Sequence, residues 1–161
     1  MSRVHLAVWL ALVMVVGAGC GASKTVVDEQ GNRTTMTDKA GGVEVTFEGK
    51  KGEKVRIAGG EGGVPLPDGF PKDVPVYPNS TPVVASTTGD VTNVVLTTAD
   101  SAAKTLAFYT EKLAAAGWTT ESTLNLPSGS MISSSKSDRT LNVTVVGEDN
   151  QTTISLGLGK K

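Results

Sequence analysis

The residues best suited to chemistry are few and lie at one end of the chain. The sequence holds a single cysteine, Cys20, and a single histidine, His5. Thiol or imidazole nucleophiles, imidazole bases and zinc sites built from cysteine or histidine therefore have no residues in the rest of the chain. Carboxylates, hydroxyls and lysines remain, and no motif pairs them for catalysis. The sequence predicts a protein that is not an enzyme and that uses no cofactor and no metal ion.

Two acidic segments deserve a chemical interpretation of their own. Asp68 and Asp73 flank Phe70 and Pro71, and two carboxylates could perform acid/base catalysis of the glycosidase kind. Beside prolines in an exposed segment, we interpret them instead as turn and solvent-facing residues. Residues 147–150, Gly-Glu-Asp-Asn, lack the alternating oxygen ligands and bidentate glutamate of a calcium loop, so we interpret them as a hairpin turn.

The amino terminus carries three features in a characteristic order. Arg3 and His5 precede residues 6–16, which contain no charged or polar side chain, and small residues follow from Gly17 onward. This order is typical of a cleaved export signal. The alternative is a transmembrane anchor, but a bilayer requires about 20 predominantly apolar residues, and the run reaches that length only by including glycines and alanines.

Cys20 stands at the end of this segment, directly after the small residues Ala18 and Gly19. The segment resembles a bacterial lipoprotein signal. This resemblance implies that the Cys20 thiol receives a diacylglyceryl group, that residues 1–19 are removed, and that the new amino terminus is acylated. More than one acyl chain would anchor the protein stably in a membrane. Because Ala22 stands where an aspartate would retain a lipoprotein at the inner membrane, the resemblance also favours the outer membrane in a host that has one.

Composition limits the partners and the core. The chain has 161 residues with 15 basic and 16 acidic side chains, a formal net charge of -1, so we expect no nucleic-acid partner. Aromatic residues make up only 4% of the chain, and the hydrophobic residues are largely Val, Ala and Leu. We therefore expect a small core rich in β-branched side chains.

We expect the chain after the signal to form three regions. Residues 20–58 contain short β-segments separated by glycine and asparagine turns, which predict a small antiparallel meander after the lipid anchor. Residues 59–82 hold six of the seven prolines and predict a flexible glycine-rich joint followed by a stiff strap. Residues 83–161 predict an α+β module, with a single helix packed on an antiparallel sheet of about five or six strands. The β-segments are expected at 24–27, 33–37, 43–47, 54–58, 83–88, 91–98, 118–126, 130–136, 139–146 and 151–158.

The helix of this module is expected from Ser101 to Ala116. Asp100 is its predicted N-cap, because a carboxylate there can accept hydrogen bonds from first-turn amides. Gly117 is predicted to end it in a left-handed conformation, with Leu113 and Trp118 forming the hydrophobic contact that accompanies a Schellman cap.

Two surface features could bind a partner. Phe108 lies off the buried stripe of the predicted helix, so it either packs under the proline strap or contacts a protein partner. The last two strands alternate strictly, so that one face is apolar and the other is polar. The polar face is either solvated or binds a glycan through hydroxyl and amide groups. Its members are Thr140, Asn142, Thr144, Thr153 and Ser155.

Two motifs resemble a known family. Residues 70–78 read Phe-Pro-Lys-Asp-Val-Pro-Val-Tyr-Pro, and Phe108-Tyr109, Leu113 and Gly117-Trp118 follow in the helix. They resemble a family of bacterial lipoproteins and secreted proteins of uncharacterised function, over roughly residues 66–159. The resemblance implies a cell-envelope setting and an α+β module, and it carries over no catalytic residue.

We therefore expect an envelope protein that is anchored to the membrane on its extracytoplasmic side through Cys20. It would act as a non-catalytic binding or scaffolding module for another envelope protein. The alternative is a binding module for cell-wall or exported glycan. A hydrolase that uses carboxylates is the least favoured interpretation.

Overall fold

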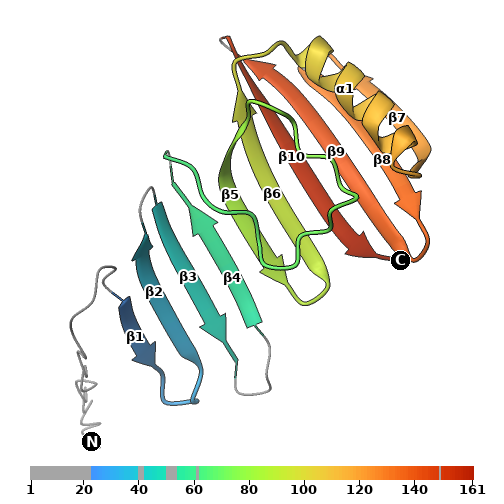
Figure 1. The fold of residues 1–161 in the computed structure, drawn as a ribbon. Helices are drawn as coiled ribbons and strands as arrows, with labels where there is room; N and C mark the ends of the chain where they lie inside the picture. Colours follow the sequence, from blue (N-terminus) through green and yellow to red (C-terminus); the bar gives the residue numbers. More distant parts are fainter. Residues whose placement is uncertain (1–22, 40–41, 50–53, 61, 149) are drawn as a thin grey trace, which may run out of the picture.

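The computed structural model describes residues 23–39, 42–49, 54–60, 62–148 and 150–161. The predicted signal peptide and Cys20 lie outside the described residues. Ten strands form one open antiparallel sheet in the order β1-β2-β3-β4-β5-β6-β10-β9-β8-β7 (Figure 1). The strands are β1 (Ser23–Val27), β2 (Arg33–Lys39), β3 (Gly42–Glu48), β4 (Lys54–Gly59), β5 (Thr81–Thr88), β6 (Val91–Thr98), β7 (Thr119–Leu126), β8 (Gly129–Lys136), β9 (Arg139–Glu148) and β10 (Gln151–Lys160).

The positions of the ten expected β-segments are confirmed, but the expected fold class is wrong. Instead of a separate meander followed by an α+β module, all ten strands belong to one sheet. Strands make up 59% of the described residues and the helix 11%. The two parts join where β4 pairs with β5, with Ile57 opposite Ser86 and Ala58 opposite Ala85. This pairing satisfies backbone groups that two separate sheets would each leave unpaired at an edge.

The helix ends as predicted and begins differently. Helix α1 spans Ala102–Ala115, and Gly117 follows with φ 79°. The Trp118 N–H donates to the Leu113 carbonyl at 2.9 Å and the Gly117 N–H to the Ala114 carbonyl at 3.0 Å, which is the predicted Schellman pattern. The predicted N-cap is wrong, because the Ser101 hydroxyl accepts from the Lys104 N–H.

The core lies on one face of the sheet, which we call the helix face. Helix α1 packs over β7, β8 and β9, and the strap, residues 62–80, crosses the neighbouring strands on the same side (Figure 1). Buried apolar side chains from the strap, helix and sheet meet there. They are Val74, Tyr77, Val94, Leu96, Tyr109, Leu113, Trp118, Ile132, Leu141, Val143, Val145, Ile154, Leu156 and Leu158. The opposite face, which we call the open face, carries no described helix or loop.

Candidate functional site

The middle of the strap is held by ion pairs with the β8–β9 hairpin. The Asp73 carboxylate accepts from both guanidinium nitrogens of Arg139, at 2.6 and 3.0 Å, and from the Lys136 ammonium at 2.7 Å. The Trp118 indole N–H donates to the Asp73 carbonyl at 2.8 Å, and the Arg139 guanidinium lies 5.1 Å from the Trp118 ring centroid. Lys136 also donates to the carbonyl of Ala116 at the end of α1. Asp73 therefore ties the strap to the hairpin and to the end of the helix.

The charge environment of Asp73 is strongly cationic. Hydrogen bonds from Arg139, and then from Lys136, hold the pKa of the Asp73 carboxyl well below its usual range, although partial burial opposes them. The same contact raises the pKa of the Arg139 guanidinium. A carboxylate held ionised by two cations accepts hydrogen bonds and does not supply a proton near neutral pH.

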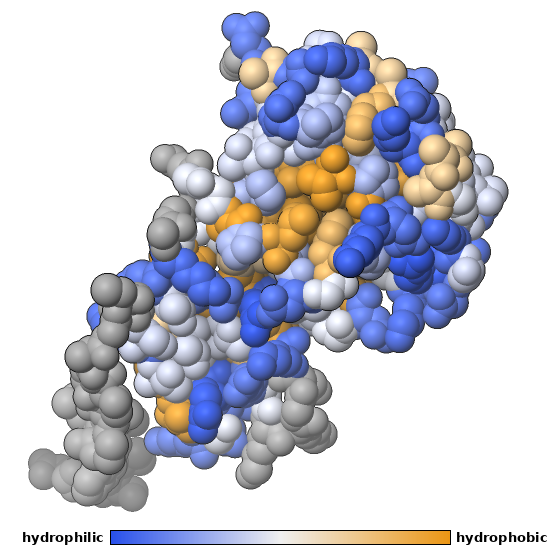
Figure 2. All heavy atoms as spheres, in the orientation of Figure 1, coloured by the Kyte–Doolittle hydropathy of each residue, from blue (hydrophilic) through white to orange (hydrophobic). Residues whose placement is uncertain are grey.

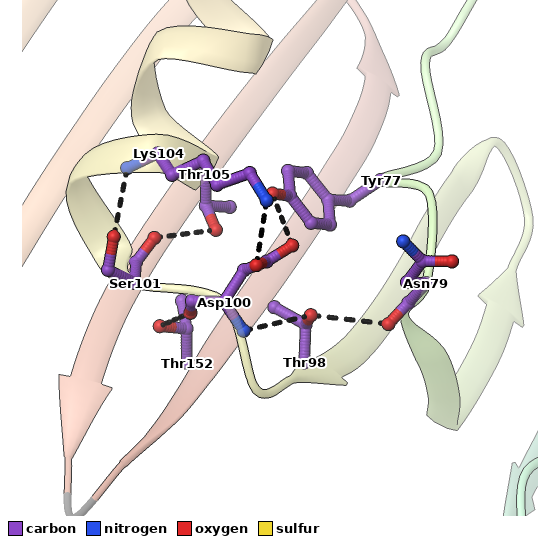
Figure 3. Close-up of polar contacts among 8 residues, drawn as sticks. All are labelled: Tyr77, Asn79, Thr98, Asp100, Ser101, Lys104, Thr105 and Thr152. Carbon is purple, nitrogen blue, oxygen red and sulfur yellow. Dashed lines mark hydrogen bonds and ion pairs between the residues drawn. The ribbon is translucent and has the colours of Figure 1, made fainter.

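The C-terminal end of the strap is held against the start of α1 (Figure 3). The Tyr77 hydroxyl donates to the Asp100 carboxylate at 2.9 Å, and Lys104 donates to its other oxygen at 2.8 Å. The Thr98 hydroxyl donates to the Asn79 carbonyl at 3.2 Å. Burial, with the Asp100 contact second, raises the pKa of Tyr77, whereas the Lys104 and Tyr77 contacts lower that of Asp100. The Asp100 side chain therefore does not cap the helix, because it hydrogen-bonds to Tyr77 of the strap instead.

The two carboxylates that could have formed an acid/base pair bind different cations. Asp68 pairs with Arg56 at 2.7 Å and its side chain is 93% exposed. Asp73 pairs with Arg139 and Lys136, and its side chain is 29% exposed. The interpretation of Asp73 as a solvent-facing residue is therefore wrong, and that of Asp68 fits its exposure.

Phe108 packs against the strap. Its ring lies 5.0 Å from that of Tyr77 and 5.3 Å from that of Tyr109, both in edge-to-face geometry, and the side chain is half-buried. Of the two interpretations of this residue, packing under the strap is the one supported by these contacts. A contact between Phe108 and a partner stays a prediction.

The five predicted glycan-binding residues share the open face. Thr144 lies opposite Ser155, and Thr153 lies opposite Val146, two pairs further along the β9–β10 ladder and next to it on the same face. Thr140 and Asn142 continue the same side of β9, each opposite a glycine of β10. The structure therefore brings these side chains together on one continuous surface, half-buried except for the exposed Asn142.

The apolar side of the sheet changes from one face to the other along the strand order. Residues directly opposite in antiparallel strands share a face, so a row across the sheet can be followed through its pairs. On the helix face one row reads Thr37, Glu44, Ala58, Ala85, Val94, Leu156, Val143, Ile132. On the open face the adjacent row reads Met36, Val45, Ile57, Ser86, Asn93, Gly157, Asn142, Ser133. Along these two rows the apolar side chains lie on the open face from β2 to β4 and on the helix face from β6 to β8.

The apolar part of the open face is exposed to solvent. We call it the proximal patch, because it lies at the β1 end of the sheet. Five of its side chains are between 40% and 58% exposed, and they are Val26, Met36, Val43, Phe47 and Ile57. Contiguous exposed apolar surface of a few hundred Å² commonly marks an interaction site.

A shallow groove lies on the helix face beside the strap. Pro67 and Asp68 form one side of it, and Lys54, Arg56 and Thr87 from β4 and β5 form the other. Arg56 pairs with Asp68 across the groove, and Lys54 pairs with Glu48 at 3.0 Å. Seen from this side, hydrophobic side chains gather over the middle of the sheet, and residues over β1–β4 are mostly hydrophilic (Figure 2). The charges lining the groove are already paired within the chain, so they favour neither an anionic nor a cationic ligand.

Neither a metal cluster nor a spanning helix is present in the part of the chain that the structure describes. Within those ranges no group of three or more His, Cys, Asp or Glu side chains could hold a metal ion. No helix there is long and apolar enough to cross a membrane.

Sequence reasoning missed two features of these surfaces. Asp73 contacts Lys136 and Arg139, which follow it by 63 and 66 positions in the sequence. No local sequence pattern predicts contacts over such a separation. The proximal patch had a signal, since β3 alternates Val43, Val45 and Phe47 with polar residues. That alternation shows an amphipathic strand but not which of its faces the rest of the chain will cover.

Comparison with known proteins finds similarity only in the C-terminal part. A family described as START domain-like matches residues 79–152, which run from the end of the strap through α1 to the start of β10. No curated protein and no solved structure matches the chain. The matched segment contains Phe108, Trp118 and Thr144, whereas β1–β4 and the proximal patch lie outside it.

Proposed function

We propose that the protein is a lipid-anchored, non-catalytic binding or scaffolding module of a bacterial cell envelope, attached through Cys20 on the extracytoplasmic side. The observation that carries the proposal is the open face, which spans all ten strands and is left uncovered by the described helix and strap. A sheet normally buries its apolar surface against a second layer. An extended, uncovered sheet surface with an exposed apolar area is suited to binding.

The ionisable groups of the helix face support a non-catalytic role. Asp73 holds the middle of the strap, Asp100 holds its C-terminal end, and Asp68 is paired with Arg56. Groups engaged in this way are paired within the chain and stabilise the fold. The START domain-like match supports ligand binding in the C-terminal part, and it assigns no catalytic residue.

The second candidate is a glycan-binding module. Its support is the polar region of the open face on β9 and β10, where Thr144 faces Ser155 and Thr153 is a diagonal neighbour of Thr144. Neighbouring hydroxyl groups on a rigid sheet can form several hydrogen bonds to one sugar ring.

The test uses the full-length chain in intact envelopes. The photoreactive residue p-benzoylphenylalanine is placed at Asn93 or Asn142, which are exposed on the open face, and at Ala103 on the exposed side of α1 as control. We expect a discrete protein adduct from Asn93 and Asn142 and none from Ala103. Adducts from Ala103 alone would contradict the open face as the binding surface.

The glycan alternative has its own variant. The double substitution Thr144→Val and Thr153→Val removes two hydroxyls from the polar region while keeping β-branched side chains. Under this alternative, retention on isolated cell wall falls strongly. The matched control, Thr119→Val with Thr123→Val on the exposed edge strand β7, keeps full retention. Equal retention of both double variants would reject the glycan site.

A further inference from the structure

The charges of the first four strands are strongly segregated between the two faces. Strands β1–β4 carry eight charged side chains. By the strand register, only Lys24 and Asp38 share the open face with the proximal patch. The other six lie on the helix face, and they are Arg33, Lys39, Glu44, Glu48, Lys54 and Arg56.

Several of the helix-face charges pair with one another. Lys39 pairs with Glu44 at 2.8 Å, Lys54 with Glu48 at 3.0 Å, and Arg56 with Glu44 at 3.9 Å. This side of β2–β4 is therefore built to face water. The opposite side of the same strands, with Met36, Phe47 and Ile57 each more than 40% exposed, is built to face an apolar environment.

The position of the patch along the chain indicates what that environment is. Strand β1 begins at Ser23, three residues after Cys20. A fully extended chain of three residues spans at most about 11 Å, so an acylated Cys20 would keep β1 within that distance of the membrane surface. The exposed apolar side chains of this face begin on β1 and extend through β4 to Val84 on β5 and Val91 on β6. A separate pair, Leu124 and Leu126, lies on the far edge strand β7, and the open face of β9 and β10 between the two areas is mostly polar. The larger apolar area of this face is therefore the one that begins beside the predicted anchor.

We propose that the proximal patch lies on the lipid surface, so that the open face of β1–β4 rests at the boundary between headgroups and acyl chains. The inference rests on the proposed anchor at Cys20. Partial burial of apolar side chains at this boundary adds to the hold of the acyl chains, as it does for amphipathic helices that lie in the membrane plane. It also fixes the orientation of the module, whose helix face then points away from the lipid at β1–β4.

The extent of the patch agrees with a planar lipid surface. Neighbouring strands in a sheet are rotated by roughly 20–25°, so a plane can contact only a few adjoining strands. The edge strand β7 lies nine strands from β1, about 43 Å away at the usual spacing, and its Leu124 is 48% exposed. Leu124 is therefore a matched control for Phe47, which is 44% exposed, because it shares the open face but is out of reach of the membrane.

The test places the acylated full-length product in vesicles of phosphatidylethanolamine and phosphatidylglycerol. Acylation occupies the only native thiol, so a cysteine introduced by Phe47→Cys, Ile57→Cys, Leu124→Cys or Thr46→Cys can be labelled alone with the fluorophore NBD. Thr46 reports on the helix face of β3. We expect nitroxide-labelled lipid to quench NBD at positions 47 and 57, and aqueous iodide to quench it there several-fold less than at 124 or 46. Tryptophan emission from Trp118 verifies folding of each variant.

The other outcomes overturn the inference and remain distinguishable from failure of the anchor. Failure of the labelled chain to float with the vesicles rejects the anchor and the inference together. Flotation with equal iodide quenching at all four positions rejects the inference alone. Protection from both quenchers at positions 47 and 57, with disulfide-linked dimers of the unlabelled variants, assigns the patch to a second copy of the chain.

Discussion

A single carboxylate, Asp73, connects three elements that are distant in sequence. It lies in the strap, and its side chain binds Arg139 and Lys136 at the two ends of the β8–β9 turn. The two cations are 26% and 28% exposed, so they are only partly solvated. Removing the anion would take away the carboxylate that the two cations share.

We expect Asp73→Asn to lower the free energy of unfolding by about 1–2 kcal/mol, because two partly buried cations lose the negative charge and one of the two acceptor oxygens that they share. Urea unfolding at pH 7, followed by Trp118 emission, measures the change. Asp68→Asn is the control, and it should cost little because its ion pair with Arg56 is at the surface. An equal loss of unfolding free energy in the two variants would show that the ion pairs of Asp73 contribute no more than the surface pair of Asp68.

The same carboxylate predicts an acid dependence of stability. Its pKa in the folded protein lies below the value of about 3.9 expected in the unfolded chain, so the unfolded state binds more protons in acid. The contribution is fully present above that value and is lost as pH falls below it. Urea unfolding between pH 5 and pH 3 should therefore show a steeper loss of stability in the native sequence than in Asp73→Asn. If stability fell equally with pH in the native sequence and in Asp73→Asn, the lowered pKa of Asp73 would be contradicted.

The proposed membrane anchor depends on the Cys20 thiol. Cys20→Ala removes the thiol that would be acylated, so we expect an uncleaved precursor without lipid label. Metabolic labelling with palmitate and the mass of the purified chain measure both effects. A variant that is still cleaved and labelled would reject lipidation at this residue.

At the scale of elements, the end of α1 joins local and long-range contacts. Gly117 accepts the left-handed conformation that the Schellman cap requires, and Trp118 then turns back onto Leu113. The buried indole also donates to the Asp73 carbonyl in the strap. The cap therefore positions the Trp118 indole, which hydrogen-bonds to the strap.

We expect Trp118→Ala to lower the free energy of unfolding by about 3–5 kcal/mol, since the ring is buried at 3% exposure. Thermal unfolding monitored by circular dichroism measures the change. Phe108→Ala, at a half-buried ring on the same helix, should lower stability less and should loosen the strap at Tyr77. An unchanged melting temperature in Trp118→Ala would show that the cap does not hold the strap.

At the scale of the whole molecule, continuous pairing through β4 and β5 replaces the expected boundary between a meander and a module. Strands β6, β10 and β9 lie at the middle of the C-terminal core, and β1 is an exposed edge. The burial of side chains therefore decreases along the strand order from β10 to β1, while hydrogen bonding between neighbouring strands is continuous.

Hydrogen exchange of the backbone amides should follow this order. We expect the strongest protection in β6, β9 and β10, intermediate protection in β4 and β5, and the weakest in β1, because opening free energies follow burial and contact density. Mass spectrometry of peptic fragments measures the profile. An abrupt step between β4 and β5 would indicate that two separately folding units meet at this pair.

Local sequence was enough to locate the strands and the end of the helix. Alternating side chains, glycine turns and the Leu113-Gly117-Trp118 spacing act over a few residues, and each of them is present in the structure. Asp100 was misassigned as the N-cap because the spacing alone does not show its competing partner, Tyr77, 23 positions earlier in the chain.

The joining of all ten strands, the Asp73 contacts and the identity of the uncovered face were decided only by tertiary structure. Each depends on residues brought together from distant parts of the chain. Ala58 and Ala85, for example, are paired in the sheet although the strap lies between them in the sequence. A period of two in a strand defines two faces, but it does not say which one the helix and strap will cover. For this reason the alternation in β3 could predict an apolar face, and only the folded sheet places that face on the side away from the core.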